Sequence, residues 1–155
     1  RDVILPTGRA SNFSIVEHPG AVAILPIFDN GDVILLRQFR VAAGGEIFEI
    51  PAGTIEVGET PRATAAREIV EETGYKAAKL VKIAEFFTAP GFCTETMHVF
   101  RATGLSPASG HQDDDEIIRP LRIPFKKALS MARTGKIRDA KSIVALLLAG
   151  DGRVR

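Results

Sequence analysis

The segment from Gly53 to Tyr75 constrains this chain more than any other part of it. It reads GTIEVGETPRATAAREIVEETGY, in which glutamates and an arginine are grouped around one short helical stretch between glycines. Thr60 is suited to cap this helix, Pro61 fits the first turn because its missing N–H is not needed there, and Gly74 is a natural stop. The sequence therefore predicts a helix that begins at Pro61 and ends before Gly74.

The acidic residues of this predicted helix share one face. At 100° per residue, Glu68, Glu71 and Glu72 fall within about a third of the helix circumference. The opposite face carries small and apolar residues, which are Ala63, Ala66, Ile69, Val70 and Thr73. Such a face is suited to close packing on a sheet. We therefore expect the helix to pack on a sheet with its acidic face turned outward.

This acidic face needs positive charge nearby. Repulsion between two carboxylates about 6 Å apart costs roughly 0.7 kcal/mol in water and about 3 kcal/mol at an effective dielectric constant of about 20. Arg67 can pair with Glu71 four residues later, which returns only about 0.5 kcal/mol. Grouped hard oxygen ligands with no histidine nearby suit Mg²⁺ or Mn²⁺ better than zinc. The pattern predicts a divalent-metal site, and a solvated acidic helix face is the alternative.

The whole segment resembles the signature of the Nudix hydrolase family. That signature is glycine, five residues, glutamate, seven residues, then Arg-Glu-apolar-x-Glu-Glu-x-Gly-apolar. The matching positions are Gly53, Glu59, Arg67, Glu68, Ile69, Glu71, Glu72, Gly74 and Tyr75. Tyr75 is the one departure, because the family more often has an aliphatic residue there. The resemblance implies a loop–helix–loop site that binds Mg²⁺ and hydrolyses a nucleoside diphosphate linked to another group.

The resemblance also implies a role for each matching residue. Glu68 and Glu72 are expected to be the principal metal ligands, with Glu71 assisting. The carbonyl of Ala52 is expected to contribute a further ligand from the loop. The structural residues are expected to be Gly53, Glu59, Arg67 and Gly74. Among these, Arg67 and Glu59 are expected to form the pair that fixes the helix to the loop.

Composition limits the class of protein. At 155 residues and 45% apolar content, the chain can bury one core, so we expect a single domain over residues 1–155. The net charge of +1 provides no overall field for nucleic acid or an anionic membrane. The single cysteine, Cys93, excludes an intramolecular disulfide. No apolar run reaches the length of a membrane span and no secretory leader is present, so we expect a cytoplasmic protein.

The rest of the chain alternates strand and helix patterns. Apolar runs at 21–28 and 32–36 are separated by Asp-Asn-Gly, which predicts a hairpin. Three further strands are expected, at 47–50, 80–87 and 96–103. Helical spacing predicts a helix over 125–132 and another after a cap at Asp139. The pattern predicts an α+β protein, an α/β/α sandwich with a mixed sheet, which agrees with the Nudix fold that the resemblance implies.

Three local features outside the signature resemble the ADP-ribose pyrophosphatase branch of the family. They are Arg37-Gln38-Phe39-Arg40 followed by residues 48–53, Ala89-Pro90-Gly91-Phe92 followed by Glu95, and the segment from Ile137 to Lys141. The likeness extends over nearly the whole chain. The residues that it implies for substrate binding are Arg40, Glu49, Pro90, Gly91 and Glu95.

Two of these residues also have a physical argument of their own. The guanidinium of Arg40 presents a fork that matches diphosphate oxygens, although a surface ion pair with Glu49 is the alternative. A rigid turn at Pro90 and Gly91 can hold a loop against a ribose or a diphosphate, although a plain turn is the alternative. By resemblance, Glu95 is expected on the ribose side.

A second acidic cluster, Asp113-Asp114-Asp115-Glu116, lies in a loop before the C-terminal helices. A solvated loop is its ordinary interpretation. The reaction needs a base for the attacking water, and in the resembled branch a loop glutamate in this region supplies it. Glu116 is our first choice. A register shift of two would make Asp114 the base and Glu116 a metal ligand. With Glu71, these two complete the expected catalytic residues.

Together these features predict Mg²⁺-dependent hydrolysis of ADP-ribose to AMP and ribose 5-phosphate, by attack of water on the diphosphate. One alternative is a hydrolase of another nucleotide sugar, such as GDP-mannose. The other is a Nudix sensor that binds a nucleotide without cutting it, although the chain keeps every expected metal ligand. The resemblance also implies a homodimer, because branch members exchange N-terminal strands between subunits.

Overall fold

The computed structural model describes residues 1–109 and 118–151. Its helices are α1 (Pro61–Thr73), α2 (Phe125–Arg133) and α3 (Ala140–Gly150), with a short 3-10 helix η1 (Val41–Ala43). Its strands are β1 (Asp2–Ile4), β2 (Ala10–Asn12), β3 (Ala21–Pro26), β4 (Asp32–Arg40), β5 (Gly45–Glu49), β6 (Ala52–Thr54), β7 (Tyr75–Phe87), β8 (Thr96–Pro107) and β9 (Ile118–Pro124). No helix within the described residues is long and apolar enough to cross a membrane.

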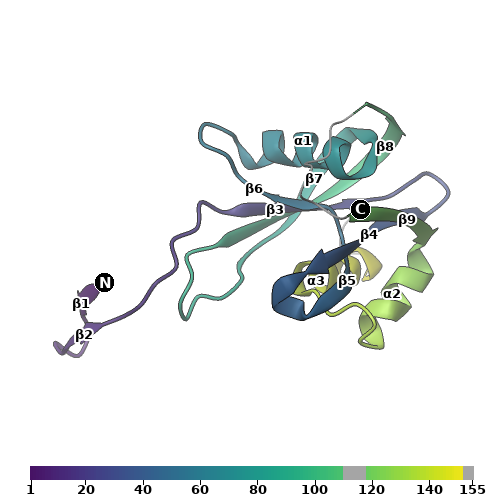
Figure 1. The fold of residues 1–155 in the computed structure, drawn as a ribbon. Helices are drawn as coiled ribbons and strands as arrows, with labels where there is room; N and C mark the ends of the chain where they lie inside the picture. Colours follow the sequence, from purple (N-terminus) through teal and green to yellow (C-terminus); the bar gives the residue numbers. More distant parts are fainter. Residues whose placement is uncertain (110–117, 152–155) are drawn as a thin grey trace.

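The helices lie on opposite sides of the strands, with α1 on one side and α2 and α3 on the other (Figure 1). One sheet has the order β6-β3-β8-β7 and the second has the order β5-β4-β9. Strands β3 and β8 are parallel, whereas every other pairing in these two sheets is antiparallel. The predicted α+β class and mixed sheet are confirmed.

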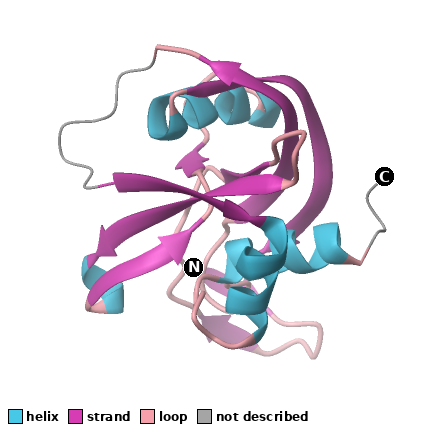
Figure 2. Ribbon diagram, turned by 90° about the vertical axis from the view of Figure 1, so that its right-hand side faces the viewer, coloured by secondary structure: helices cyan, strands magenta, loops and turns pink. Residues whose placement is uncertain are grey.

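Strand β3 separates the two cores. Ala21, Ala23 and Leu25 pack toward α2 and α3, whereas Val22 and Ile24 pack toward α1. All six residues of β3 are buried, because both faces of the strand are covered. The sandwich arrangement is visible in Figure 2, where the strands cross between the helices.

The predicted hairpin of 21–28 with 32–36 is wrong beyond its turn. The turn itself forms, since Gly31 has φ +82° and donates its N–H to the carbonyl of Phe28 at 2.8 Å. Only one bridge, Ile27 to Val33, joins the two arms. Strand β3 then pairs with β6 and β8, while β4 pairs with β5 and β9. An apolar run with two buried faces fits the interior of a sheet better than a two-stranded hairpin.

The ends of α1 are those that the sequence predicts. The Thr60 side chain accepts a hydrogen bond from the Ala63 N–H, and Pro61 occupies the first turn. Gly74 has φ +71° and donates its N–H to the Val70 carbonyl, which closes the helix in the left-handed conformation that glycine favours.

The prediction for the packed face of α1 is wrong in part. Ala63 and Ala66 are exposed. The buried residues of α1 are Thr64, Ala65, Ile69, Glu72 and Thr73. Glu72 is only 5% exposed, so the acidic face does not point to open solvent as expected. The helix is rotated so that Ala65 and Ile69 pack on the sheet and Glu72 faces β6, because the sheet and the β6 loop cover adjoining sides of the helix.

Arg67 ties the loop before α1 to the helix. Its Nε and Nη2 donate to the two carboxylate oxygens of Glu59, each at 3.1 Å. Thr64 Oγ1 also donates to Glu59 at 2.8 Å. The hydrogen bonds from Arg67, followed by that from Thr64, lower the pKa of Glu59 to about 2. The expected arginine–glutamate pair is therefore present.

Helix α3 is attached to the sheet through its first turn. Asp139 caps the helix by accepting the Ser142 N–H at 3.0 Å. Ser142 Oγ in turn accepts the N–H of Ile50 at 2.7 Å. Ser142 and Ile50 are both fully buried. The predicted Asp139 cap thus also fixes the segment between β5 and β6.

We expect Ser142→Ala to lower the free energy of unfolding by about 1–3 kcal/mol, because the buried Ile50 N–H loses this acceptor. Urea denaturation at neutral pH measures the change. Ser130→Ala, at an exposed position of α2, is the matched control and should change it by less than about 0.5 kcal/mol. Equal stability of Ser142→Ala and the parent chain would contradict the assigned hydrogen bond.

Glu59→Gln should destabilise the fold at neutral pH and much less in acid. The folded pKa of about 2 lies below the ordinary value of 4.5, so ionised Glu59 stabilises the folded state fully above pH 4.5. That contribution is lost as the pH falls from 4.5 toward 2. Thermal unfolding of both proteins from pH 7 to pH 2 measures it, with Asp29→Asn at an exposed position as control. A melting-temperature difference independent of pH would refute the pair.

Candidate active site

A pocket of about 610 Å³ opens between α1, β6 and the start of α3. It brings together many of the residues singled out in the sequence, which are Arg40, Ala52, Gly53, Arg67, Glu68, Glu71, Glu72 and Glu95. One wall carries the carboxylates of α1, and another carries the cationic side chains of Arg40 and Lys141. The pocket can therefore bind positive and negative groups side by side.

The carboxylates of α1 are held by hydrogen bonds. Arg67 Nη1 donates to Glu68 Oε1 and to Glu71 Oε2, both at 2.8 Å. Glu72 Oε2 accepts the N–H of Ala52 at 2.8 Å. Hydrogen bonding to Glu59 is the leading cause that raises the pKa of Arg67 above its ordinary value, so this guanidinium stays charged. A positive charge already lies between two of the expected metal ligands.

Gly53 leaves the space that the Glu68 side chain occupies. A methyl group on Gly53 would lie 1.8 Å from Glu68 Oε1 and 2.0 Å from its carboxyl carbon. The carboxylate therefore lies directly against the backbone of the loop. A side chain at position 53 would collide with this carboxylate, so the glycine of the signature has a steric role here. Its φ angle is not positive, so backbone conformation is not the reason.

The donors of this wall fit a hard divalent ion. Glu68, Glu71 and Glu72 offer only carboxylate oxygens, which Mg²⁺ and Mn²⁺ prefer. Over residues 1–109 and 118–151, no three acidic, histidine or cysteine side chains already converge as a metal site. The hydrogen bonds explain this, because Arg67 draws Glu68 and Glu71 together while Ala52 holds Glu72. Glu68, Glu71 and Glu72 would be the residues of this wall that hold such an ion.

The second wall is built on a buried carboxylate. Glu49 accepts hydrogen bonds from Arg40 Nε and Nη2, both at 2.9 Å, and from Lys141 Nζ at 2.8 Å. Burial raises the pKa of Glu49, but the hydrogen bonds from Arg40 and the charge of Lys141 outweigh it and leave the pKa below its ordinary value. Arg40 forms the ion pair with Glu49 that was the alternative interpretation, and it also lines the pocket. Its contact with a diphosphate stays a prediction.

Glu49 itself is not placed as a substrate contact. Its side chain is 3% exposed, and it is absent from the pocket lining. The expectation that it touches substrate directly is therefore not supported, because the carboxylate is covered by the two cations that it binds. It lies behind the wall of the pocket.

The two ends of the loop between β7 and β8 line the pocket, whereas the tip of the loop does not. Glu95 lines the pocket and accepts a hydrogen bond from Thr88, which also lines it. Pro90 and Gly91 are exposed and lie outside the pocket lining. The tip is instead joined to the N-terminal segment, where Val16 donates its N–H to the Phe92 carbonyl at 2.7 Å. The Pro-Gly turn is thus not brought to this pocket.

The second acidic cluster, 113–116, falls within residues 110–117 and lies outside the described residues. The choice between Glu116 and Asp114 as the base therefore stays a prediction.

Sequence reasoning missed several residues that line the pocket, among them Phe86, Thr88, Asp139 and Lys141. The segment from Ile137 to Lys141 carried a signal, because it belongs to the branch likeness and contains the α3 cap. Its two charged pocket residues lie at the start of α3, where α3 meets Glu49 of β5. Nothing in the local sequence around Phe86 distinguishes it from other residues of an alternating strand.

Comparison with known proteins agrees with this geometry. An ADP-ribose pyrophosphatase from Bacillus subtilis (strain 168) is 46% identical over 147 residues, which cover 94% of this chain and 80% of that protein. A GDP-mannose pyrophosphatase from Klebsiella pneumoniae is 39% identical over 136 residues, covering 82% and 68%. The solved structure of an ADP compounds hydrolase superimposes with a TM-score of 0.82 at 26% identity, covering 99% and 85%.

The family model of the NUDIX domain matches residues 17–146, which include both sheets, the pocket and most of α3. The loop, the capped acidic helix and the glycine under Glu68 are the parts of the signature that build the acidic wall. With the family model covering most of its length and a relative at 46% identity, this chain belongs to the Nudix family.

Proposed function

We propose that this protein is a Mg²⁺-dependent hydrolase that splits ADP-ribose into AMP and ribose 5-phosphate. The observation that carries the proposal is the pocket with two unlike walls, carboxylates of α1 on one side and Arg40 with Lys141 on the other. A diphosphate needs both, because metal ions neutralise some of its oxygens and cationic side chains bind others. The Bacillus subtilis relative named ADP-ribose pyrophosphatase supports the substrate.

Different residues of the pocket would bind the metal ion and the diphosphate. Glu68, Glu71, Glu72 and the Ala52 loop would hold the ion, whose chemistry is to neutralise phosphate oxygens and activate water. The guanidinium of Arg40 donates hydrogen bonds to the diphosphate. Its pairing with Glu49 limits its rotation, so less entropy is lost when substrate binds.

The remaining roles concern the proton and the sugar. We propose that Glu116 or Asp114 acts as the general base that accepts a proton from the attacking water, because the reaction needs a base outside the metal ligands. Glu95 is proposed to face the ribose, in keeping with its position at the pocket edge beside Thr88.

Two other functions compete with this one. Hydrolysis of GDP-mannose is favoured by the Klebsiella pneumoniae relative, but that relative is less similar and matches less of the chain than the Bacillus subtilis one. A nucleotide sensor without activity would be expected to lose a metal ligand. Glu68, Glu71 and Glu72 are all present and line the pocket, which favours catalysis.

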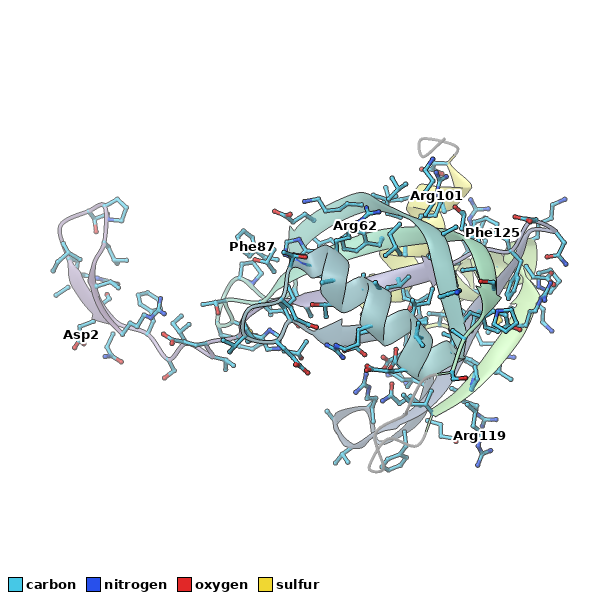
Figure 3. The ribbon with its side chains drawn as sticks, turned by 90° about the horizontal axis from the view of Figure 1, so that it is seen from above. Asp2, Arg62, Phe87, Arg101, Arg119 and Phe125 are labelled. Carbon is cyan, nitrogen blue, oxygen red and sulfur yellow. The ribbon has the colours of Figure 1, made fainter. Side chains whose placement is uncertain are left out.

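We also propose that the protein is a cytoplasmic homodimer. The hairpin of β1 and β2 extends away from the body of the chain, with Asp2 far from the rest (Figure 3). Ile4 is 72% exposed and Val3 is 36% exposed on this hairpin. Apolar side chains on a projecting hairpin suit contact with a second subunit.

Glu72→Gln should lower kcat/KM for ADP-ribose by roughly a hundredfold or more, because partners of metal ligands alone are worth about 10–100-fold. The amide oxygen can still accept the Ala52 N–H, so the melting temperature without metal should be unchanged or slightly higher. Glu85→Gln, on β7 outside the pocket, is the control and should keep full activity. Near-parental activity of Glu72→Gln at saturating Mg²⁺ would refute the metal assignment.

Among ADP-ribose, GDP-mannose, NADH, diadenosine polyphosphates and 8-oxo-dGTP, ADP-ribose should have the highest kcat/KM. Phosphate release after coupling to alkaline phosphatase measures the rate for the compounds without a terminal phosphate, and release of pyrophosphate measures it for 8-oxo-dGTP. A preference of tenfold or more for GDP-mannose would replace the proposed substrate with its rival. Binding of these compounds with no turnover of any of them would favour the sensor.

A further inference from the structure

The segment that precedes β3 runs beside the loop between β7 and β8 (Figure 1). Val16 donates its N–H to the Phe92 carbonyl at 2.7 Å, and its own carbonyl accepts the N–H of Thr94 at 3.0 Å. Two residues further on, the N–H of His18 donates to Thr94 Oγ1 at 2.8 Å. These three hydrogen bonds fix the backbone of His18 next to the residue that precedes Glu95.

The ring of His18 has one nitrogen bonded to the backbone and one next to Glu95. The N–H of Gly20 donates to Nδ1 at 3.1 Å, so Nδ1 carries no proton and the ring proton is on Nε2. Nε2 lies 3.8 Å from Glu95 Oε1. That distance is too long for a direct hydrogen bond, and it fits an electrostatic contact or one bridged by a water molecule. The donor end of the ring therefore faces the Glu95 carboxylate.

The Glu95 carboxylate is thus held from two sides. Its Oε2 accepts a hydrogen bond from Thr88, the residue that follows β7, whereas its Oε1 faces His18. The Glu95 side chain is 22% exposed and lines the pocket, whereas His18 is not among the described residues that line it. A carboxylate has about four acceptor sites, so some remain for a hydroxyl group in the pocket. His18 can therefore orient Glu95 without touching what Glu95 binds.

The turn at Gly20 does not by itself require a histidine. An asparagine could accept the Gly20 N–H, because its amide oxygen is attached to Cγ as Nδ1 is. The outer nitrogen of the ring is the one that reaches Glu95. The backbone of this segment is already fixed by its hydrogen bonds to residues 92–94. The extra reach of the ring is better explained by the carboxylate at the pocket.

We propose that His18 is a positioning residue that holds Glu95 in the orientation in which it binds a ribose hydroxyl of the substrate. The inference rests on the proposed function, in which Glu95 faces the ribose. It adds a residue of the N-terminal segment that belongs to neither charged wall of the pocket. Because His18 acts only through Glu95, it affects binding of the sugar and not the step at phosphorus.

The test compares two substitutions that each keep one of the two ring contacts. His18→Asn keeps an acceptor for the Gly20 N–H and loses the donor to Glu95, whereas His18→Gln keeps an N–H near the place of Nε2 and loses the acceptor. His18→Asn should raise KM for ADP-ribose about three- to tenfold, the range for loss of one polar contact, with little change in kcat. His18→Gln should keep KM closer to that of the parent chain, even where its melting temperature falls.

A double-mutant cycle with Glu95→Ala shows whether His18 acts through Glu95. His18→Asn should have no further effect on KM once the Glu95 carboxylate is gone. His98→Gln is the matched control, because His98 Nδ1 also lies near a glutamate, Glu85 at 3.0 Å, but outside the described lining of the pocket. It should keep the KM of the parent chain. An equal rise in KM in both backgrounds would overturn the inference.

Binding of the two proposed products separates this inference from the proposed function. AMP and ribose 5-phosphate, each with Mg²⁺, are titrated into the parent and His18→Asn proteins by calorimetry. An affinity loss of about three- to tenfold for either compound supports the role of His18. If the parent chain binds them but does not cleave ADP-ribose, the proposed function fails and this comparison still decides the role of His18. Equal affinities of the two proteins for both compounds, or no binding of either by the parent chain, overturns the inference.

Discussion

The charge balance at Arg67 is the interaction on which the rest of the site depends. One guanidinium hydrogen-bonds to Glu59, Glu68 and Glu71, so it holds the preceding loop to α1 and keeps two pocket carboxylates side by side. Without a cation there, each carboxylate pair would repel by up to about 3 kcal/mol in a partly buried setting. Glu72 is buried beside the Ala52 backbone, whose N–H donates to its carboxylate.

The sandwich turns these local contacts into a pocket. Strand β3 is buried on both faces, so it fixes α1 on one side and α3 on the other. Strand β5 ends at Glu49, which lies behind the cationic wall and binds Lys141. The chain then enters β6, where Gly53 lies against the Glu68 carboxylate. The carboxylates of the acidic wall therefore come from α1 on one side of β3, and Lys141 of the cationic wall comes from α3 on the other.

The places where sequence reasoning failed share a cause. The sequence predicted the turn at Gly31, but a local pattern cannot predict that β3 and β4 belong to different sheets. The apolar stripe expected on α1 included Ala63 and Ala66, which are exposed because the sheet meets the helix nearer to Ala65 and Ile69. Small residues bury too little area to decide the rotation of a helix by themselves. Long-range strand pairing therefore decided the sheets to which β3 and β4 belong, and the size of the side chains decided the rotation of α1.

What the sequence by itself determined is local chemistry. The caps of α1 and α3, the glycine stop, the Arg67–Glu59 pair and the family could all be read from residues close together in the chain, since hydrogen bonds and spacing act over one or two helical turns. Only the tertiary structure decided that Glu49 is buried behind Arg40, that Lys141 joins it, and that Pro90 lies away from the pocket. The contact between Lys141 and Glu49 joins residues 92 positions apart. No local pattern predicts it, because burial and contacts between distant charges arise only when the sheets pack together.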